Sequence, residues 1–161
     1  MKYVVCFSGG HSSALAAIET VKLYGAENTI LLNHDISPDV EHEDIKRFKR
    51  EVAAYLGLPI TYANMPGWER LTPLKIAVAK KAFQTQPGQA LCTYNLKTLP
   101  FYKWLANNFP AHDCTIVYGF DAAEKNRMER RTKLLQSMGY STFYPLAKKM
   151  AAALPILRNW A

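Results

Sequence analysis

Two glycines and three serines stand together near the start of the chain, in the run Ser8-Gly9-Gly10-His11-Ser12-Ser13. Glycine allows close backbone approach to a ligand and tolerates positive φ, and the serines add hydroxyl donors. A strand-like run precedes this hexapeptide and helical spacing follows it. Its amides therefore lie at a helix N-terminus, where unpaired N–H groups and the helix dipole favour anions. The combination predicts a phosphate-binding loop.

The loop matches neither of two common phosphate-binding patterns. It has no G-x-x-x-x-G-K-[ST], so it is not a Walker A loop, and no G-x-G-x-x-G, so it is not a dinucleotide fingerprint. Taken alone, a serine followed by two glycines after a strand is also explained by a tight turn with serine as a helix cap.

The loop needs a sheet edge to hold it, and the rest of the chain supplies candidate strands. Apolar, β-branched runs predict strands over residues 3–7, 29–33, 60–63, 115–119 and 141–144. Helices are expected from Ala14 to a cap at Gly25, from Ser37-Pro38 to Gly57, from Thr72-Pro73 to Phe83, and over 98–107, 122–138 and 146–160. Residues 84–89 are expected to form a loop, and Pro155 to interrupt the last helix.

The alternation of these elements predicts how they pack. Strands that alternate with helices favour parallel pairing and right-handed crossovers. We expect a three-layer α/β/α sandwich with a mainly parallel five-stranded sheet, and a single domain over 1–161 with a divergent tail from about residue 146. Ligands in such sheets bind at the carboxyl ends of strands, where Ser8–Ser13 falls.

Composition limits the classes of protein. The 161 residues carry a net charge of +7, and this basic balance attracts phosphates on nucleotides or nucleic acid. The basic clusters at 46–50 and 125–133 lie on expected helices, where charge runs are mostly solvated faces. Three widely spaced cysteines, no signal peptide and no membrane span predict a cytoplasmic protein with reduced thiols.

Four segments carry a resemblance to a known family. The strand followed by S-G-G-x-x-S resembles the PP-loop of the adenine nucleotide alpha hydrolase-like superfamily, a HUP/Rossmann-like group. Within it, the chain is most similar to the phosphoadenosine phosphosulfate (PAPS) reductase-like family. Asp35 after the second strand, Cys92-x-x-x-x-Lys97-x-x-Pro100 and the segment from Tyr118 to Arg127 agree in order.

The resemblance implies an enzyme that binds ATP or a related adenine nucleotide and cleaves it between the α and β phosphates. Ser8, Gly9, Gly10, His11, Ser12, Ser13, Asp35 and Gly119 would bind the nucleotide. Asp35 would help to hold Mg²⁺. Lys97 and Arg127 would be catalytic and stabilise developing charge.

Three departures from the family pattern bear on activity. Ser12 replaces the usual aspartate of the loop, and Asp121 replaces the usual arginine after Gly119. The C-terminal E-C-G-[LI]-H motif that carries the reductase nucleophile is missing, and the tail Ala151–Ala161 does not match it. We therefore expect no reduction of PAPS. Cys92 is expected in a polar loop beside Lys97, either as a reactive thiol or as an inert one, and Cys6 in the core.

Three functions stay open at this stage. The first is an enzyme that transfers AMP to an acceptor or activates it, the acceptor being a sulfur compound or a nucleic-acid base. The second is a binder without turnover, because the loop aspartate is lost at Ser12. The third is a nucleic-acid-binding module that uses the positive charge, although the sequence shows no interleaved aromatic motif typical of RNA-binding domains. Association into a homo-oligomer is also left open.

Overall fold

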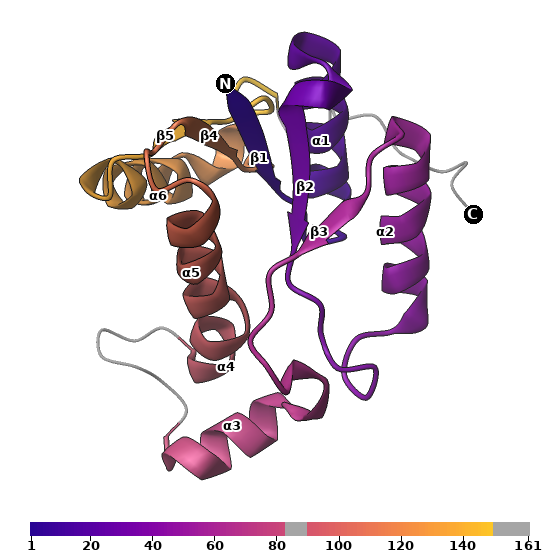
Figure 1. Cartoon of the computed structure of the whole chain (residues 1–161), viewed down its shortest axis with the longest axis vertical. Helices are drawn as coiled ribbons and strands as arrows, with labels where there is room; N and C mark the ends of the chain where they lie inside the picture. The colour runs from indigo at the N-terminus through magenta and orange to yellow at the C-terminus, as the bar shows by residue number, and fades with distance from the viewer. Residues whose placement is uncertain (83–89, 150–161) are drawn as a thin grey trace. The chain divides into compact units, whose positions relative to one another are not determined.

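A computed structural model describes residues 1–82 and 90–149 of the chain (Figure 1). The chain forms two compact units. The first comprises Met1–Asn33, Ile45–Thr61 and the segment from Ala111 onward, and the second comprises His34–Asp44 and Tyr62–Pro110. The single domain expected over 1–161 stays a prediction.

Five parallel strands form the sheet, in the order β3-β2-β1-β4-β5. Their bounds are β1 Lys2–Cys6, β2 Thr29–Asn33, β3 Ile60–Tyr62, β4 Cys114–Val117 and β5 Ser141–Phe143. Register pairs Val4 of β1 with Ile30 of β2 and with Ile116 of β4. The predicted parallel sheet is confirmed, and each strand lies within one residue of its expected start.

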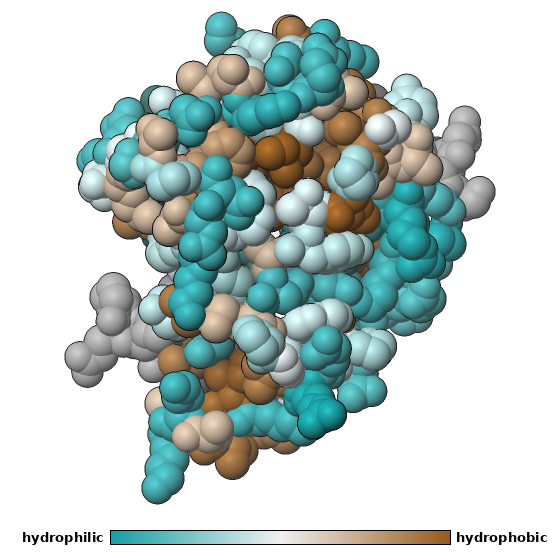
Figure 2. All heavy atoms as spheres, in the orientation of Figure 1, coloured by the Kyte–Doolittle hydropathy of each residue, from teal (hydrophilic) through white to brown (hydrophobic). Residues whose placement is uncertain are grey.

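Two helices cover one face of the sheet (Figure 1). They are α1 (His11–Tyr24) and α2 (Glu43–Leu56), and a 3-10 turn over Ala26–Asn28 follows α1. Their apolar sides join the sheet in one buried cluster, made up of Val5, Phe7, Ala14, Ala16, Ala17, Leu31, Val52, Ala53 and Val117. Mainly hydrophilic residues cover α2 on its outer side (Figure 2), as its amphipathic sequence predicts.

The helix α6 (Lys125–Ser137) covers the opposite face. Phe143 of β5 packs on the α1 side of the sheet, where its ring meets that of Tyr24 edge to face. The preceding residue, Thr142, points the other way because strand side chains alternate, and its hydroxyl lies 3.3 Å from that of Thr132 on α6. The three-layer α/β/α arrangement is thereby confirmed.

The start of α2 differs from the sequence prediction. Ser37 does not cap this helix, which begins at Glu43. Instead Ser37 closes a separate turn. Its carbonyl accepts hydrogen bonds from the backbone amides of Val40 and Glu41, and its hydroxyl accepts one from the backbone amide of Asp39. The prediction that Ser37-Pro38 begins the helix is wrong. A serine followed by proline can begin a turn as well as a helix, because the serine side chain bonds nearby backbone amides in both.

Helices and turns make up the second unit. A 3-10 turn spans Trp68–Arg70, and α3 runs over Pro73–Lys80 with the Thr72 hydroxyl accepting from the Lys75 amide as a cap. The expected extension of α3 to Phe83 is wrong within the described residues, because Lys81 adopts a φ of +53° and ends the helix.

The helix expected over 98–107 begins earlier in the structure. A helical turn α4 (Leu91–Thr93) passes through a π-helical segment (Tyr94–Thr98) into α5 (Leu99–Asn108). Pro100 has no backbone N–H and cannot donate a helical hydrogen bond, and the π-helical segment just before it changes the hydrogen-bond spacing at this point of the helix. Cys92 therefore lies on a helical turn, and its placement in a polar loop was wrong.

The loop predicted for 84–89 lies outside the described residues. The terminal helix predicted over 146–160 is wrong at its start, because residues 145–148 form a turn, and the rest of that helix and the tail lie outside the described residues. Within residues 1–82 and 90–149, no helix has the length and apolar character needed to cross a membrane.

Candidate functional site

The glycine turn connects β1 to α1 with a left-handed residue at its centre. Gly9 has a φ of +85°, a conformation that strongly favours glycine. A Cβ on residue 9 would lie 2.8 Å from Cγ and 2.9 Å from Cδ of Lys49, and 3.1 Å from Cγ2 of Ile45. Gly9 is therefore required both by its backbone conformation and by the α2 side chains beneath it.

Gly10 differs from its neighbour. Its φ of −84° and ψ of 161° are ordinary extended values, and a Cβ there would have only the Ser8 hydroxyl oxygen near it, at 3.6 Å. Neither the backbone nor the packing of the described residues requires glycine at this position.

No side chain caps the N-terminus of α1. Its first helical hydrogen bond runs from the Ala14 amide to the Gly10 carbonyl, 3.1 Å long, so the amides just before Ala14 precede the helical ladder. The N-cap residue of α1 is Gly10, which has no side chain, and no acidic residue stands in the first turn of the helix. Negative charge on a ligand would meet these amides and the positive end of the helix dipole.

The loop serines hold one another. The Ser8 hydroxyl donates to that of Ser13 over 3.3 Å, and the Ser13 hydroxyl donates to the Gly10 carbonyl over 2.9 Å. Ser13 is buried, whereas Ser8, Gly10 and His11 are exposed. The buried Ser13 therefore stabilises the turn through its hydrogen bonds, whereas Ser8 and His11 lie at the surface of the loop.

A buried lysine forms the floor of the loop, and the sequence prediction missed it. Lys49 is 1 % exposed, and its ammonium donates to Oδ1 of Asn33 over 3.2 Å. The Asn33 amide in turn donates to the Phe7 carbonyl over 2.6 Å. The solvated face expected for 46–50 is therefore wrong at Lys49. Helical spacing could have shown this, because Lys49 lies four residues after Ile45 and three before Val52, on the apolar stripe.

Gly119 lies against the other side of the same turn. A Cβ on residue 119 would be 2.5 Å from the Ser12 carbonyl oxygen and 2.9 Å from the Ser13 amide nitrogen. Both neighbours are backbone atoms that cannot rotate away. The structure thus brings Gly119, at the carboxyl end of β4, together with the loop, as the sequence predicted.

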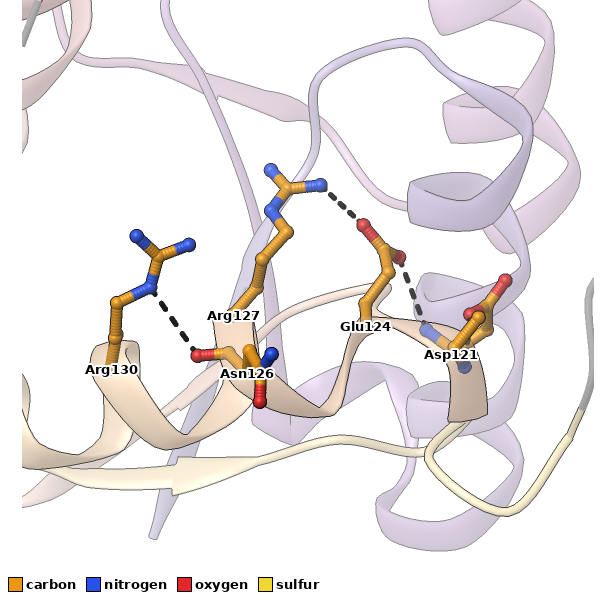
Figure 3. Close-up of polar contacts among 6 residues, drawn as sticks. Asp121, Glu124, Asn126, Arg127 and Arg130 are labelled. Carbon is orange, nitrogen blue, oxygen red and sulfur yellow. Dashed lines mark hydrogen bonds and ion pairs between the residues drawn. The ribbon is translucent and has the colours of Figure 1, made fainter.

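Arg127 lies on the first turn of α6 (Figure 3). Its guanidinium forms an ion pair with Glu124, and the Arg127 side chain is 60 % exposed. Glu124 and Asp121 form a capping box, in which Asp121 accepts from the Ala123 amide and Glu124 accepts from the Asp121 amide. Asp121, which replaces the arginine of the resembled family, therefore caps the 3-10 turn (Ala122–Glu124) that precedes α6.

Asp35 and Lys97 belong to the second unit. The Asp35 backbone exchanges two hydrogen bonds with the Asn64 side chain, and its carboxylate accepts from the Ile36 amide over 3.0 Å. Next to it, burial lowers the pKa of His34 below 6.5, and the Lys97 ammonium lowers it further. The roles predicted for Asp35 in binding the nucleotide and Mg²⁺, and for Lys97 in catalysis, stay predictions.

The cysteines are free thiols in the structure. Burial raises the pKa of Cys6 to about 12, although a hydrogen bond from Tyr118 and the charge of Arg131 act in the opposite direction. Burial also raises the pKa of Cys114 to about 11. Both thiols are thus protonated near neutral pH and poor nucleophiles.

A metal cage of protein side chains is not found among residues 1–82 and 90–149, where no three His, Cys, Asp or Glu side chains cluster. Mg²⁺ that rides on a triphosphate needs only one or two carboxylates, so the single carboxylate of Asp35 is chemically suited to it. Comparisons of the chain with protein-family models, curated proteins and solved structures give no match.

Proposed function

We propose that the chain binds an adenine nucleotide with its phosphates on the Ser8–Ser13 loop, and that it cleaves ATP or a related nucleotide between the α and β phosphates. The N-terminus of α1 has no side-chain cap and lies at the carboxyl edge of a parallel sheet, which supports an anion at this position. The choice of an adenine nucleotide and of this bond comes from the resemblance to the PP-loop and PAPS reductase-like proteins.

One observation carries the proposal: the glycine at position 10. Its backbone is in a conformation open to any residue, and a Cβ would make only an ordinary van der Waals contact with the Ser8 hydroxyl oxygen, at 3.6 Å. A glycine that folding does not need is explained by the close approach of a ligand to the backbone. Gly9, by contrast, is fully explained by its own turn and by Lys49.

The chain's residues would divide the work. The amides of the glycine turn and the Ser8 hydroxyl would hold phosphate oxygens. Arg127 would stabilise charge that develops as the bond breaks, for which its guanidinium would have to exchange Glu124 for phosphate. Mg²⁺ held by Asp35 would neutralise charge on the phosphates. The roles of Asp35 and Lys97 rest on the sequence resemblance alone.

The first experiment measures binding by calorimetry with ATP, ADP, AMP and PAPS. We expect Gly10→Val to abolish binding while circular dichroism and thermal unfolding stay near those of the wild type. Ser137→Val, at the far end of α6, is a control for adding a β-branched side chain at the surface. Equal affinity of the wild type and Gly10→Val would reject the assignment of the site.

The second experiment identifies the products after incubation with ATP, Mg²⁺ and candidate acceptors. We expect AMP and pyrophosphate, with slow turnover when no acceptor is present. Arg127→Ala should reduce kcat more than it weakens binding. ADP as the main product would reject cleavage between the α and β phosphates. Tight binding without any product would favour the second candidate, a binder without turnover, to which the loss of the loop aspartate at Ser12 points.

The proposal extends to redox chemistry and location. Without the reductase tail motif, thioredoxin-dependent release of sulfite from PAPS is not expected. Sulfite release that Cys92→Ser abolishes would overturn this part and make Cys92 a nucleophile. The free cysteines support a reducing compartment, and the cytoplasm is the location we assign.

A further inference from the structure

Three aromatic rings from two separate segments of the sequence come together at the carboxyl edge of β4 and β5. The rings of Tyr118 and Phe120 are 5.3 Å apart at an angle of 5°. The Tyr144 ring lies 6.0 Å from that of Phe120 and 6.4 Å from that of Tyr118, at 19° and 23°. All three residues are partly exposed. They form a layer of nearly parallel rings that no run of the sequence reveals.

Hydrogen bonds hold two of these rings in place. The Tyr144 hydroxyl donates to the Met128 carbonyl over 3.1 Å and lies 2.7 Å from the Thr132 hydroxyl, which ties it to α6. The Tyr118 hydroxyl forms a hydrogen bond with the Cys6 sulfur. A layer fixed in this way loses little conformational entropy when a flat ligand stacks on it.

Arginines from α6 lie on the rings. The guanidinium carbon of Arg127 is 4.6 Å from the centre of the Phe120 ring, and that of Arg131 is 5.4 Å from the centre of the Tyr118 ring. Arg130 shares their helix face, because residues at i, i+3 and i+4 are neighbours. The helix carries five basic residues and one acidic residue. Phe120 and Tyr118 with the arginines of this face are called the aromatic–arginine layer below.

We propose that the aromatic–arginine layer binds single-stranded nucleic acid, with bases stacked on the rings and guanidinium planes and phosphates on the arginine edges. Rings and guanidinium planes accept any base by stacking, and arginine forks bind phosphate oxygens. The face from Arg127 to Arg131 rises about 6 Å along the helix and carries three guanidinium groups, so it can contact more than one phosphate of a chain of nucleotides.

A duplex fits the layer less well. Its bases are stacked inside the helix and offer no faces to the Phe120 ring, so only the phosphate contacts would remain. Preference for single strands is therefore the property that separates this site from the general attraction of a chain with a net charge of +7. The inference goes beyond the nucleotide-cleaving function and does not depend on it, because strand binding needs no occupant on the Ser8–Ser13 loop.

The test measures fluorescence anisotropy of labelled 15-residue oligonucleotides with the full chain and no added nucleotide. Single-stranded DNA and RNA of mixed sequence are compared with the matching duplex, between 50 and 300 mM salt (about the range over which counterion release is resolved). We expect single strands to bind at least about tenfold more tightly than the duplex, since stacking adds to phosphate contacts. With two to three phosphates engaged, log K should fall with log salt at a slope of about −1.4 to −2.1.

Variants assign the binding to the layer. Arg127→Gln and Lys22→Gln remove the same charge, but Lys22 lies exposed on α1, so only the first should weaken single-strand binding by more than about fivefold. Phe120→Leu should do the same for single strands and leave duplex binding unchanged. Comparable circular dichroism establishes that each variant is folded. Equal binding of strand and duplex, equal effects of Arg127→Gln and Lys22→Gln, or no binding at 50 mM salt would each overturn the proposal.

Discussion

The stem of Lys49 lies directly beneath Gly9, with its Cγ and Cδ 2.8 and 2.9 Å from where a Cβ on residue 9 would be. The same lysine ends on Asn33 at the carboxyl end of β2, and Asn33 bonds the carbonyl of Phe7, just after β1. One side chain thus links α2, the glycine turn and the ends of two strands. Its burial holds the loop at a fixed height above the sheet edge, which a binding loop needs for preorganisation.

Gly9→Ala should lower the free energy of unfolding by more than the backbone strain at a positive φ accounts for. A positive φ in a residue with a Cβ costs about 1–2 kcal/mol, and overpacking against Lys49 adds about 1–3 kcal/mol. Gly57→Ala is the matched control, because Gly57 has a φ of +67° but no atom within 4 Å of an added Cβ. Urea unfolding should give a larger loss for Gly9→Ala, and equal losses would show that Lys49 yields without cost.

Lys49→Met tests the ammonium apart from the stem. Methionine keeps an unbranched apolar chain beneath Gly9 but leaves Oδ1 of Asn33 without its lysine donor, and an unsatisfied buried acceptor costs about 1–3 kcal/mol. Lys22→Met removes an exposed lysine whose ion pair with Glu19 is 3.5 Å long, and such a pair contributes about 0–1 kcal/mol. Denaturant unfolding of both variants should separate them, and a stable Lys49→Met would mean that the stem alone supports the loop.

Periodicity predicted the sheet well, because its strands are short runs rich in apolar and β-branched residues and are bounded by turn residues. The runs at 3–7 and 29–33 became β1 and β2 with Val4, Val5, Leu31 and Leu32 fully buried. Prediction failed where local signals have two outcomes. Ser37 closes a turn instead of capping α2, and the π turn before Pro100 has no sequence signal that distinguishes it from a loop.

Gly119→Ala should disturb the loop from the β4 side. The added Cβ would meet the Ser12 carbonyl and the Ser13 amide, which belong to the backbone and can move only with α1 itself. We expect a loss of about 1–3 kcal/mol in the free energy of unfolding and a weaker nucleotide affinity if the loop binds phosphate. Gly10→Ala is the control for stability, since its Cβ would make only an ordinary contact with the Ser8 hydroxyl oxygen, at 3.6 Å. A Gly119→Ala protein as stable as Gly10→Ala would show that the turn adapts.

The candidate site was predictable in its glycines and not in its supporting side chains. The sequence identifies Gly9 and Gly10 because a glycine turn after a strand allows close approach of the backbone to a ligand, and it identifies Gly119 through the family resemblance. Helical spacing can place Lys49 on the apolar stripe of α2, but its buried ammonium pairs with Asn33, a residue sixteen positions away, and no local pattern of the sequence identifies that pair. Tyr144 likewise meets Tyr118 and Phe120 only because β4 and β5 are neighbours in the sheet. Such long-range pairs are properties of the fold.

His34 should make stability fall in mild acid. Its ring nitrogen Nδ1 donates to the Ala63 carbonyl over 2.6 Å, and burial lowers its pKa below the ordinary value of 6.5. Below pH 6.5 the unfolded chain takes up a proton at this site that the folded chain still refuses, so the free energy of unfolding falls as pH falls toward the folded pKa. Urea unfolding from pH 7.5 to 5 should show this loss for the wild type and a smaller one for His34→Gln.

Lys97 offers a second, finer test of the same histidine. Its ammonium lowers the pKa of His34 by charge repulsion, an effect smaller than that of burial. Lys97→Gln should therefore raise the His34 pKa partway toward 6.5 in an NMR titration and lessen the loss of stability in acid. Lys103→Gln, an exposed lysine on α5, removes the same charge elsewhere in the second unit and should leave that pKa near the wild-type value. Equal shifts in the two variants would mean that the net charge, and not the position of Lys97, acts on His34.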